Sequence, residues 1–151
     1  MIATYIHSSA FLRLIMQQGD VSAVERALGA NPTSSTLAGL EIRAAIFKQW
    51  HDGQISEGER DTLLVVSEQH ILVNLALLDL GPETVSEAQN VVARHSLRTL
   101  DALHVATAIQ ANRYLRRRGA RLEFVTADRR QSEAAREIFD PDSVTFVPPW
   151  R

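Results

Sequence analysis

The sequence predicts a single α/β domain, a three-layer α/β/α sandwich on a central parallel sheet of four to five strands. Short apolar stretches alternate with longer helical ones, which is the order expected for a parallel sheet covered on both faces. The 151 residues are enough for one domain with a substantial core. No internal repeat, low-complexity tract or linker interrupts residues 1–151, so the whole chain is expected to form that one domain.

The strands are expected where short apolar runs occur. The first, residues 2–7, reads IATYIH and is partly β-branched. The apolar stretch ILVNLALLDL predicts a buried strand within residues 71–80. Two further strands are expected at residues 122–126 and 144–147. Residues 33–35, which follow the Asn31-Pro32 break, are instead expected to supply helix caps.

The helices are bounded by capping residues and helix breakers. Ser8 and Ser9 can cap the first helix, and Gly19 is a natural stop for it. Ser56 and Glu59 have the spacing of a capping box. A further helical stretch precedes Asn31. The other helices are expected at about residues 8–18, 36–50, 56–69, 83–94, 99–118 and 129–139, and the 99–118 helix is apolar on several faces and therefore buried on more than one side.

The composition excludes several classes of protein. With no cysteine, the chain has neither disulfides nor thiolate metal sites. The N-terminus lacks a basic stretch before its apolar residues, so it does not resemble a signal peptide. No apolar run approaches the ~20 residues that a membrane helix needs. A cytoplasmic protein without membrane contact is therefore expected.

Charge is distributed unevenly along the chain. Residues 1–90 carry 5 basic and 11 acidic groups, whereas residues 91–151 carry 11 basic and 7 acidic groups. Arginine, whose planar fork suits phosphate recognition, supplies 15 of the 16 basic residues. The arginines at 116–118 fit a solvated helix end, where cations are favoured. Contact with nucleic acid or a partner is the alternative.

Three acidic residues and one histidine are the candidate site residues: His7, Glu41, Asp101 and Asp128. His7 and Asp128 fall at the carboxyl ends of predicted strands, where parallel sheets bind their ligands. Carboxylates that meet from separate elements suggest a site for a hard divalent cation, because Mg²⁺ and Mn²⁺ prefer oxygen ligands.

Each acid also has a structural explanation. Glu41 lies on an apolar helical stripe and could form a buried ion pair with an arginine. Asp101 is in the first turn of a helix, where the dipole favours an acid. Asp128 has Gln131 three residues on, which matches an N-cap. For these three residues, a structural role and a ligand role both remain open.

Three further polar residues lie close in the sequence to His7, Asp101 or Asp128. His104 follows Asp101 by one helical turn and could be a second ligand or a hydrogen-bonded core residue. Ser9 and Thr126 could cap helices, or they could orient a carboxylate or a water molecule.

Taken together, four stretches resemble the motifs of the PIN-domain ribonucleases, in particular the VapC-type toxins of bacterial toxin–antitoxin pairs. The stretches are YIHSSAFLRL, SSTLAGLEIRAA, LRTLDALHVATA and FVTADRR, and the resemblance covers about residues 3–147. The third stretch is the most specific. The resemblance implies a PIN-like fold, site acids at Glu41, Asp101 and Asp128, and supporting roles for Ser9 and Thr126.

The same resemblance implies a metal-dependent endoribonuclease. Glu41, Asp101, Asp128 and position 7 would hold one or two Mg²⁺ or Mn²⁺ ions, which generate a hydroxide-like nucleophile and stabilise charge on the phosphate. It further implies an RNA substrate, a cognate VapB-like antitoxin and a homodimer. The alternatives are a PIN-fold protein that binds RNA or antitoxin without turnover, and a nuclease that acts on DNA.

The chain departs from the family pattern at His7, where the first aspartate is expected. Imidazole is a poorer ligand for Mg²⁺ than carboxylate, and one negative charge is lost. Activity should therefore be weakened or abolished. Either the natural protein carries His7, or His7 is an acquired inactivating change. We favour the second explanation, because the codons for Asp and His differ by one base. The three acids are expected to converge in one pocket, with His7 on its rim.

Overall fold

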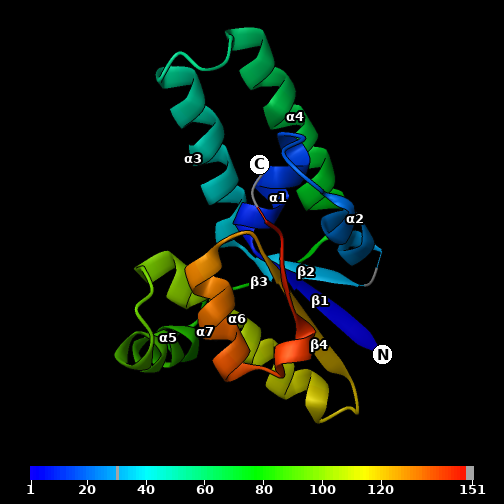
Figure 1. The fold of residues 1–151 in the computed structure, drawn as a ribbon, viewed down its shortest axis with the longest axis vertical. Helices are drawn as coiled ribbons and strands as arrows, with labels where there is room; N and C mark the ends of the chain where they lie inside the picture. Colours follow the sequence, from blue (N-terminus) through cyan, green and yellow to red (C-terminus); the bar gives the residue numbers. More distant parts are fainter. Residues whose placement is uncertain (30, 149–151) are drawn as a thin grey trace.

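The computed structural model describes residues 1–29 and 31–148, which form a five-stranded parallel sheet flanked by helices (Figure 1). The strand order is β3-β2-β1-β4-β5, and every neighbouring pair is parallel. The predicted α/β sandwich on a parallel sheet is therefore confirmed. The strands are β1 (Ile2–Ile6), β2 (Pro32–Ser35), β3 (Ala76–Leu78), β4 (Arg121–Thr126) and β5 (Val144–Phe146).

Helices cover both faces of this sheet. In the described part of the chain they are α1 (Ser8–Ile15), α2 (Ser22–Leu28), α3 (Leu37–His51), α4 (Glu57–Asn74), α5 (Pro82–Arg94), α6 (Thr99–Arg116), α7 (Arg129–Ile138) and the short 3₁₀ helix η1 (Pro141–Ser143). Helices α3 and α4 pack together and project beyond the sheet (Figure 1). None of the described helices combines the length and the apolarity needed to cross a membrane.

The alternation of side chains along β1 and β4 divides the core into two clusters. Tyr5 and Phe124 point to one face and pack with α5, α6 and α7. Ile6 and Val125 point to the other face and pack with α1, α2 and α3. Successive residues of a strand face opposite sides, so two adjacent positions on each strand supply both clusters.

The strand expected within residues 71–80 is present, but it is short and only partly buried. The backbone of residues 71–74 continues α4, which began at its capping box at Ser56, and β3 spans only Ala76–Leu78. A short apolar run fits a buried helix end as well as a strand, and periodicity alone does not separate the two.

The strand β2 was missed, because Pro32 and the hydroxyl residues after it predict a break and caps. In the fold this polar strand lies between β1 and β3, with its hydroxyls paired to neighbouring backbone. Thr33 Oγ1 donates to the Ala76 carbonyl at 2.8 Å, and Ser34 Oγ donates to the Ile6 carbonyl at 2.7 Å. The neighbouring strands thus satisfy side chains that would otherwise be costly to bury.

The register between β1 and β4 determines where the candidate site lies. Ile2 pairs with Arg121 and Ile6 with Val125, so the two strands end side by side. The His7 backbone N–H then donates to the Val125 carbonyl at 2.9 Å. This bond brings the residue after β1 next to the residues that follow β4.

Candidate functional site

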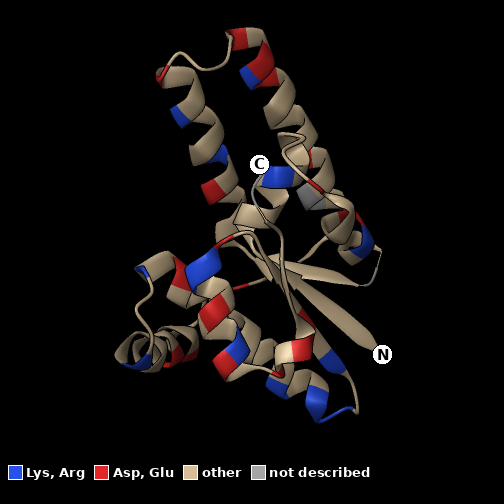
Figure 2. Ribbon diagram, viewed as in Figure 1, with Lys and Arg blue, Asp and Glu red and all other residues tan. Residues whose placement is uncertain are grey.

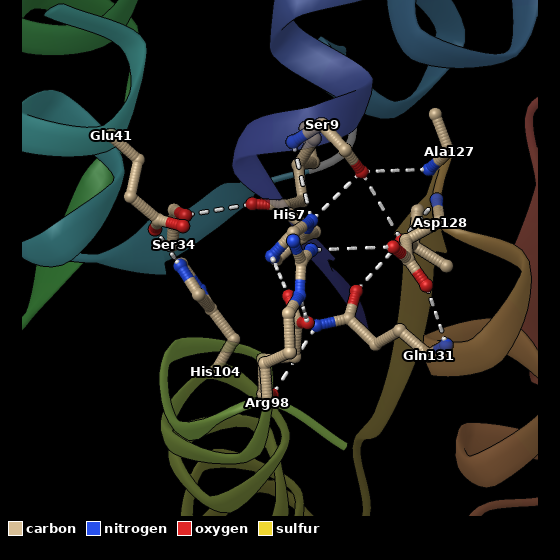
Figure 3. Close-up of polar contacts among 12 residues, drawn as sticks. His7, Ser9, Ser34, Glu41, Arg98, His104, Ala127, Asp128 and Gln131 are labelled. Atoms are coloured by element: carbon tan, nitrogen blue, oxygen red, sulfur yellow. Dashed lines mark hydrogen bonds and ion pairs between the residues drawn. The ribbon is translucent and has the colours of Figure 1, made fainter. Parts of the chain in front are cut away.

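His7 is the N-cap of α1 and lies at the centre of the candidate site (Figure 3). Its Nδ1 atom accepts the backbone N–H of Ser9 at 3.2 Å and lies 2.8 Å from Ser9 Oγ. Because a backbone N–H can only donate, Nδ1 is an acceptor here, and the neutral ring carries its proton on Nε2. Ser9 therefore determines both the orientation and the tautomer of His7.

The other ring nitrogen of His7 is buried without a hydrogen-bonding partner among residues 1–29 and 31–148. Its nearest carboxylate oxygen is Asp101 Oδ1, at 3.6 Å, which is too long for an N–H···O bond. His7 is only 3% exposed. Burial lowers the pKa of His7 well below its usual range, and His104 and Arg98 lower it further. The ring is therefore neutral at neutral pH.

Asp101 and Asp128 share a cation supplied by the chain itself. Arg98 Nε donates to Asp101 Oδ2 at 2.9 Å, and Arg98 Nη2 lies 3.6 Å from Asp128 Oδ2. The hydrogen bond to Asp101 raises the pKa of Arg98, and the charges of the surrounding acids add to this effect. The Asp101 side chain is buried, whereas that of Arg98 is mostly exposed. Arg98 thus covers two of the predicted site acids from the solvent side.

Asp128 is the N-cap of α7, as its spacing from Gln131 suggested. The Gln131 backbone N–H donates to Asp128 Oδ1 at 2.9 Å. The fully buried Gln131 side chain binds elsewhere: it accepts from Thr126 Oγ1 at 2.7 Å and donates to the Asp101 carbonyl at 3.3 Å. Asp128 Oδ1 therefore has a capping role, while Oδ2 remains available to Arg98 or another cation.

Ser9 and Thr126 connect the ends of β1 and β4. The Ala127 backbone N–H donates to Ser9 Oγ at 2.9 Å, and the Asp128 N–H donates to Thr126 Oγ1 at 3.1 Å. The two hydroxyl oxygens lie 3.3 Å apart. These contacts hold His7 and Asp128 in position, so both hydroxyl residues act on the site through their neighbours.

Glu41 reaches the site from α3 and pairs with His104 rather than with an arginine. Its Oε1 atom contacts His104 Nε2, and His104 is fully buried. Tyr5 Oη lies 2.8 Å from the other nitrogen, His104 Nδ1. Burial raises the pKa of Tyr5, so its hydroxyl stays protonated and can donate to that nitrogen. Glu41, His104 and Tyr5 form one continuous polar chain into the core.

The expectation that His7 lies on the rim of a common pocket was wrong. The rings of His7 and His104 are 4.4 Å apart, and His7 lies between Glu41 and Asp128 (Figure 3). Asp101 Oδ1 is 3.6 Å from His7 Nε2. Because β1 runs through the middle of the sheet, the residue after it emerges between the helices rather than at their edge.

A cleft opens beside Asp101 and Asp128. It is lined by Ser96, Leu97, Arg98, Asp101, Asp128, Arg129 and Arg130. Two of the predicted site acids thus share a cleft with three arginines, a combination that can bind metal ions and phosphate groups together.

Most arginines of the C-terminal half lie outside this cleft. The end of α6 and the start of β4 carry several of these arginines (Figure 2), at the opposite end of β4 from Thr126. Arg113 pairs with Glu87, and Arg118 lies over the Tyr114 ring. Their position fits the solvated helix end expected from the dipole.

The chain matches the PIN-domain family over residues 4–137. It belongs to the PIN-domain family. PIN domains are generally metal-dependent nucleases that act on RNA, and the matched region includes all of the candidate site residues. A comparison with curated proteins found no match.

The arrangement in this PIN domain does not fit a magnesium ion held by oxygen atoms alone. Position 7 supplies a buried imidazole whose Nε2 has no hydrogen-bonding partner among the described residues. Glu41 contacts His104, and Asp101 Oδ2 binds Arg98. Mg²⁺ requires near-octahedral oxygen coordination. The site thus combines three carboxylates with two buried imidazole rings.

Several residues of the site were missed or left undecided from sequence. Arg98 was missed, although its position three residues before Asp101 allows contact across the first helical turn. Gln131 was considered only as part of a cap, although its side chain links Thr126 to α6. The role of Tyr5 could not be predicted, because an aromatic residue in a buried strand is typical of the hydrophobic core.

Proposed function

We propose that this PIN domain is an endoribonuclease toxin of the VapC type whose Mg²⁺- or Mn²⁺-dependent activity is weakened or abolished by His7. The observation that carries this proposal is the cleft in which Asp101 and Asp128 lie beside Arg98, Arg129 and Arg130. In this proposal, the carboxylates bind the divalent ion and the arginines contact the RNA backbone. Glu41 completes the set of acids from the other side of His7.

The arginines of the cleft suit phosphate recognition. A guanidinium group binds phosphate oxygens through two parallel hydrogen bonds and remains charged at all relevant pH values. Contacts with phosphates position a nucleic acid but do not read its sequence. The cleft therefore supports RNA binding without indicating which RNA is bound.

Position 7 explains why cleavage should be weak. We propose that His7 stands where the family has its first aspartate, because it directly follows β1 and lies between Glu41 and Asp101. Histidine supplies neither the negative charge nor the oxygen ligand of an aspartate. The remaining acids would therefore bind Mg²⁺ less well.

Restoring the carboxylate tests the proposal. The His7→Asp protein should cut RNA in a metal-dependent way, with a gain of ~100-fold over the present chain, equivalent to ~2.7 kcal/mol of transition-state stabilisation. Adding Asp101→Asn should abolish that gain, since both residues would serve the same ion. The three proteins are compared with Mg²⁺, Mn²⁺ and EDTA on several RNAs. No gain in any of these combinations would contradict the nuclease proposal.

A second candidate is a PIN-fold protein that binds RNA without turnover. The contact of Arg98 with Asp101 and Asp128 favours it, because a resident cation on these acids competes with a metal ion. Fluorescence anisotropy with labelled RNA should then show equal affinity for the present chain and the His7→Asp protein, and neither would cleave. A labelled DNA of matching sequence in both assays tests the alternative of a nuclease that acts on DNA.

The proposed partners are a cognate VapB-like antitoxin and a second copy of the chain. Both proposals rest on the resemblance of the four motifs to VapC-type toxins. An antitoxin segment that reaches the cleft could place its own arginine on Asp101 and Asp128, where Arg98 now lies.

A further inference from the structure

Three potential metal ligands lie together on the core side of the candidate site. His7, Glu41 and His104 each offer one ligand atom, and these atoms all lie within 4.8 Å of one another. In a tetrahedral zinc site with bonds of about 2.0–2.1 Å, ligand atoms are about 3.4 Å apart. Small side-chain movements would therefore bring the three atoms onto one ion.

An independent observation points into this cluster. His7 Nε2 is buried and has no hydrogen-bonding partner in the described part of the chain. Buried polar nitrogens are nearly always paired, because an unpaired one costs about 1–3 kcal/mol. A ligand bound to Nε2 would remove this cost.

The surrounding hydroxyl groups suit two coordinating imidazoles. Ser9 Oγ lies 2.8 Å from His7 Nδ1, and Tyr5 Oη lies 2.8 Å from His104 Nδ1. When a metal binds Nε2 of a neutral imidazole, the ring proton moves to Nδ1, and a hydroxyl oxygen can accept it. His7 would give up only its longer bond to the Ser9 backbone N–H, at 3.2 Å.

Asp101 lies where a fourth ligand could bind. Its Oδ1 atom is 3.6 Å from His7 Nε2, while its other oxygen, Oδ2, binds Arg98. An ion on His7 Nε2 could therefore meet Oδ1 without breaking the contact between Asp101 and Arg98.

We propose that His7, His104 and Glu41, with Asp101 Oδ1 beside them, form a site for a divalent first-row transition metal ion, represented by Zn²⁺. Two imidazoles with a carboxylate are ligands of catalytic zinc and of non-haem iron, whereas Mg²⁺ selects oxygen atoms. The replacement of a carboxylate by His7 thus changes which metal the site prefers. The inference concerns the same site as the proposed function but is tested without RNA.

Metal binding is measured directly by titration calorimetry on the metal-free full chain with ZnCl₂, MnCl₂ and MgCl₂. One Zn²⁺ per chain is expected, bound more tightly than Mg²⁺. The Glu41→Gln and His7→Asn proteins should each bind Zn²⁺ more weakly, by at least the roughly 10–100-fold that the loss of a group supporting a metal ligand costs, because each loses a ligand itself. With Co²⁺ as a spectroscopic probe, the present chain should show the visible absorption of a four-coordinate site, and both variants should lose it.

His70 provides the matched control, since it is exposed on α4 and is not one of the three clustered ligands. His70→Gln should leave Zn²⁺ binding unchanged. Circular dichroism checks that each variant is folded. If His7→Asn does not fold, the Glu41→Gln protein alone tests the inference, because the Glu41 side chain is partly exposed and glutamine has the same shape. Zn²⁺ binding that is absent from the present chain, unaffected by Glu41→Gln, or lost in His70→Gln would overturn the inference. A failure of His7→Asp to cut RNA would leave it standing and would contradict only the nuclease proposal.

Discussion

The Nε2 atom of His7 faces the Oδ1 atom of Asp101 across 3.6 Å, and both side chains are almost completely buried. The distance is too long for a hydrogen bond. Two groups that could share a cation therefore lie opposite each other without binding directly. We therefore propose that the metal preference of this PIN domain depends on the residue at position 7, because that residue faces Asp101.

Removing the cation that covers the acids should make them more available. In the His7→Asp protein, a further Arg98→Gln change should tighten Mg²⁺ binding several-fold, because the guanidinium no longer competes for Asp101 and Asp128. The free energy of unfolding of the metal-free protein should fall by about 1–3 kcal/mol, because the buried Asp101 carboxylate loses its hydrogen bond to Arg98. Titration calorimetry and urea unfolding measure the two effects.

Arg94→Gln is the matched control for this experiment, because Arg94 is exposed at the end of α5. It should leave Mg²⁺ affinity unchanged. If Arg98→Gln weakens Mg²⁺ binding instead, Arg98 supports the acids rather than competing for them.

The hydrogen bond between Tyr5 and His104 should matter for stability. Tyr5→Phe removes a buried hydroxyl and leaves His104 Nδ1 without this contact. The expected loss is about 1–3 kcal/mol in the free energy of unfolding, because the desolvated nitrogen is no longer satisfied. Tyr114→Phe on the exposed face of α6 should change it by less than about 0.5 kcal/mol. Equal effects of both changes in urea unfolding would show that the buried bond contributes nothing.

The buried His7 should make the protein sensitive to acid. Its pKa is lowered in the folded state, so below about pH 6.5 the unfolded chain binds more protons than the folded chain. The free energy of unfolding should therefore fall as the pH drops below 6.5, by at most about 1.4 kcal/mol per pH unit from this residue. Urea unfolding of metal-free protein at pH 7.5 and 5.5 measures the fall.

The same measurement on His7→Gln isolates the contribution of this one residue, because His104 and the acids remain in place. The fall between the two pH values should be smaller in His7→Gln than in the present chain, and His70→Gln should match the present chain. An identical fall in all three proteins would mean that His7 does not titrate as its burial implies.

The proposed antitoxin can be sought by co-expression. The chain should co-purify with the product of a small adjacent reading frame, because position 7 is buried and is a small part of any such interface. A charge-reversing Asp128→Arg change in the cleft should weaken the complex if an antitoxin arginine binds there. The Asp52→Arg change at the exposed end of α3 is the control. Failure to co-purify would count against the toxin assignment.

The sequence by itself predicted the class of fold and most of the elements. Alternating apolar and helical stretches carried the prediction of a parallel sheet, and the capping box at Ser56 and Glu59 is present as expected. These features are local: their signals lie within one turn of helix or one strand, so a single sequence contains them. The candidate acids could also be named from sequence, since each lies in a distinctive short motif.

Only the tertiary structure showed what these side chains contact. β2 could not be predicted, because its hydroxyls are satisfied by β1 and β3, far away in the sequence. The partner of Glu41 is 63 residues away, and Ser9 meets Ala127 across the ends of β1 and β4. Helix packing and strand register bring such pairs together, and no local pattern encodes them. The central position of His7 follows for the same reason: it depends on β1 lying in the middle of the sheet, which is a property of the whole fold.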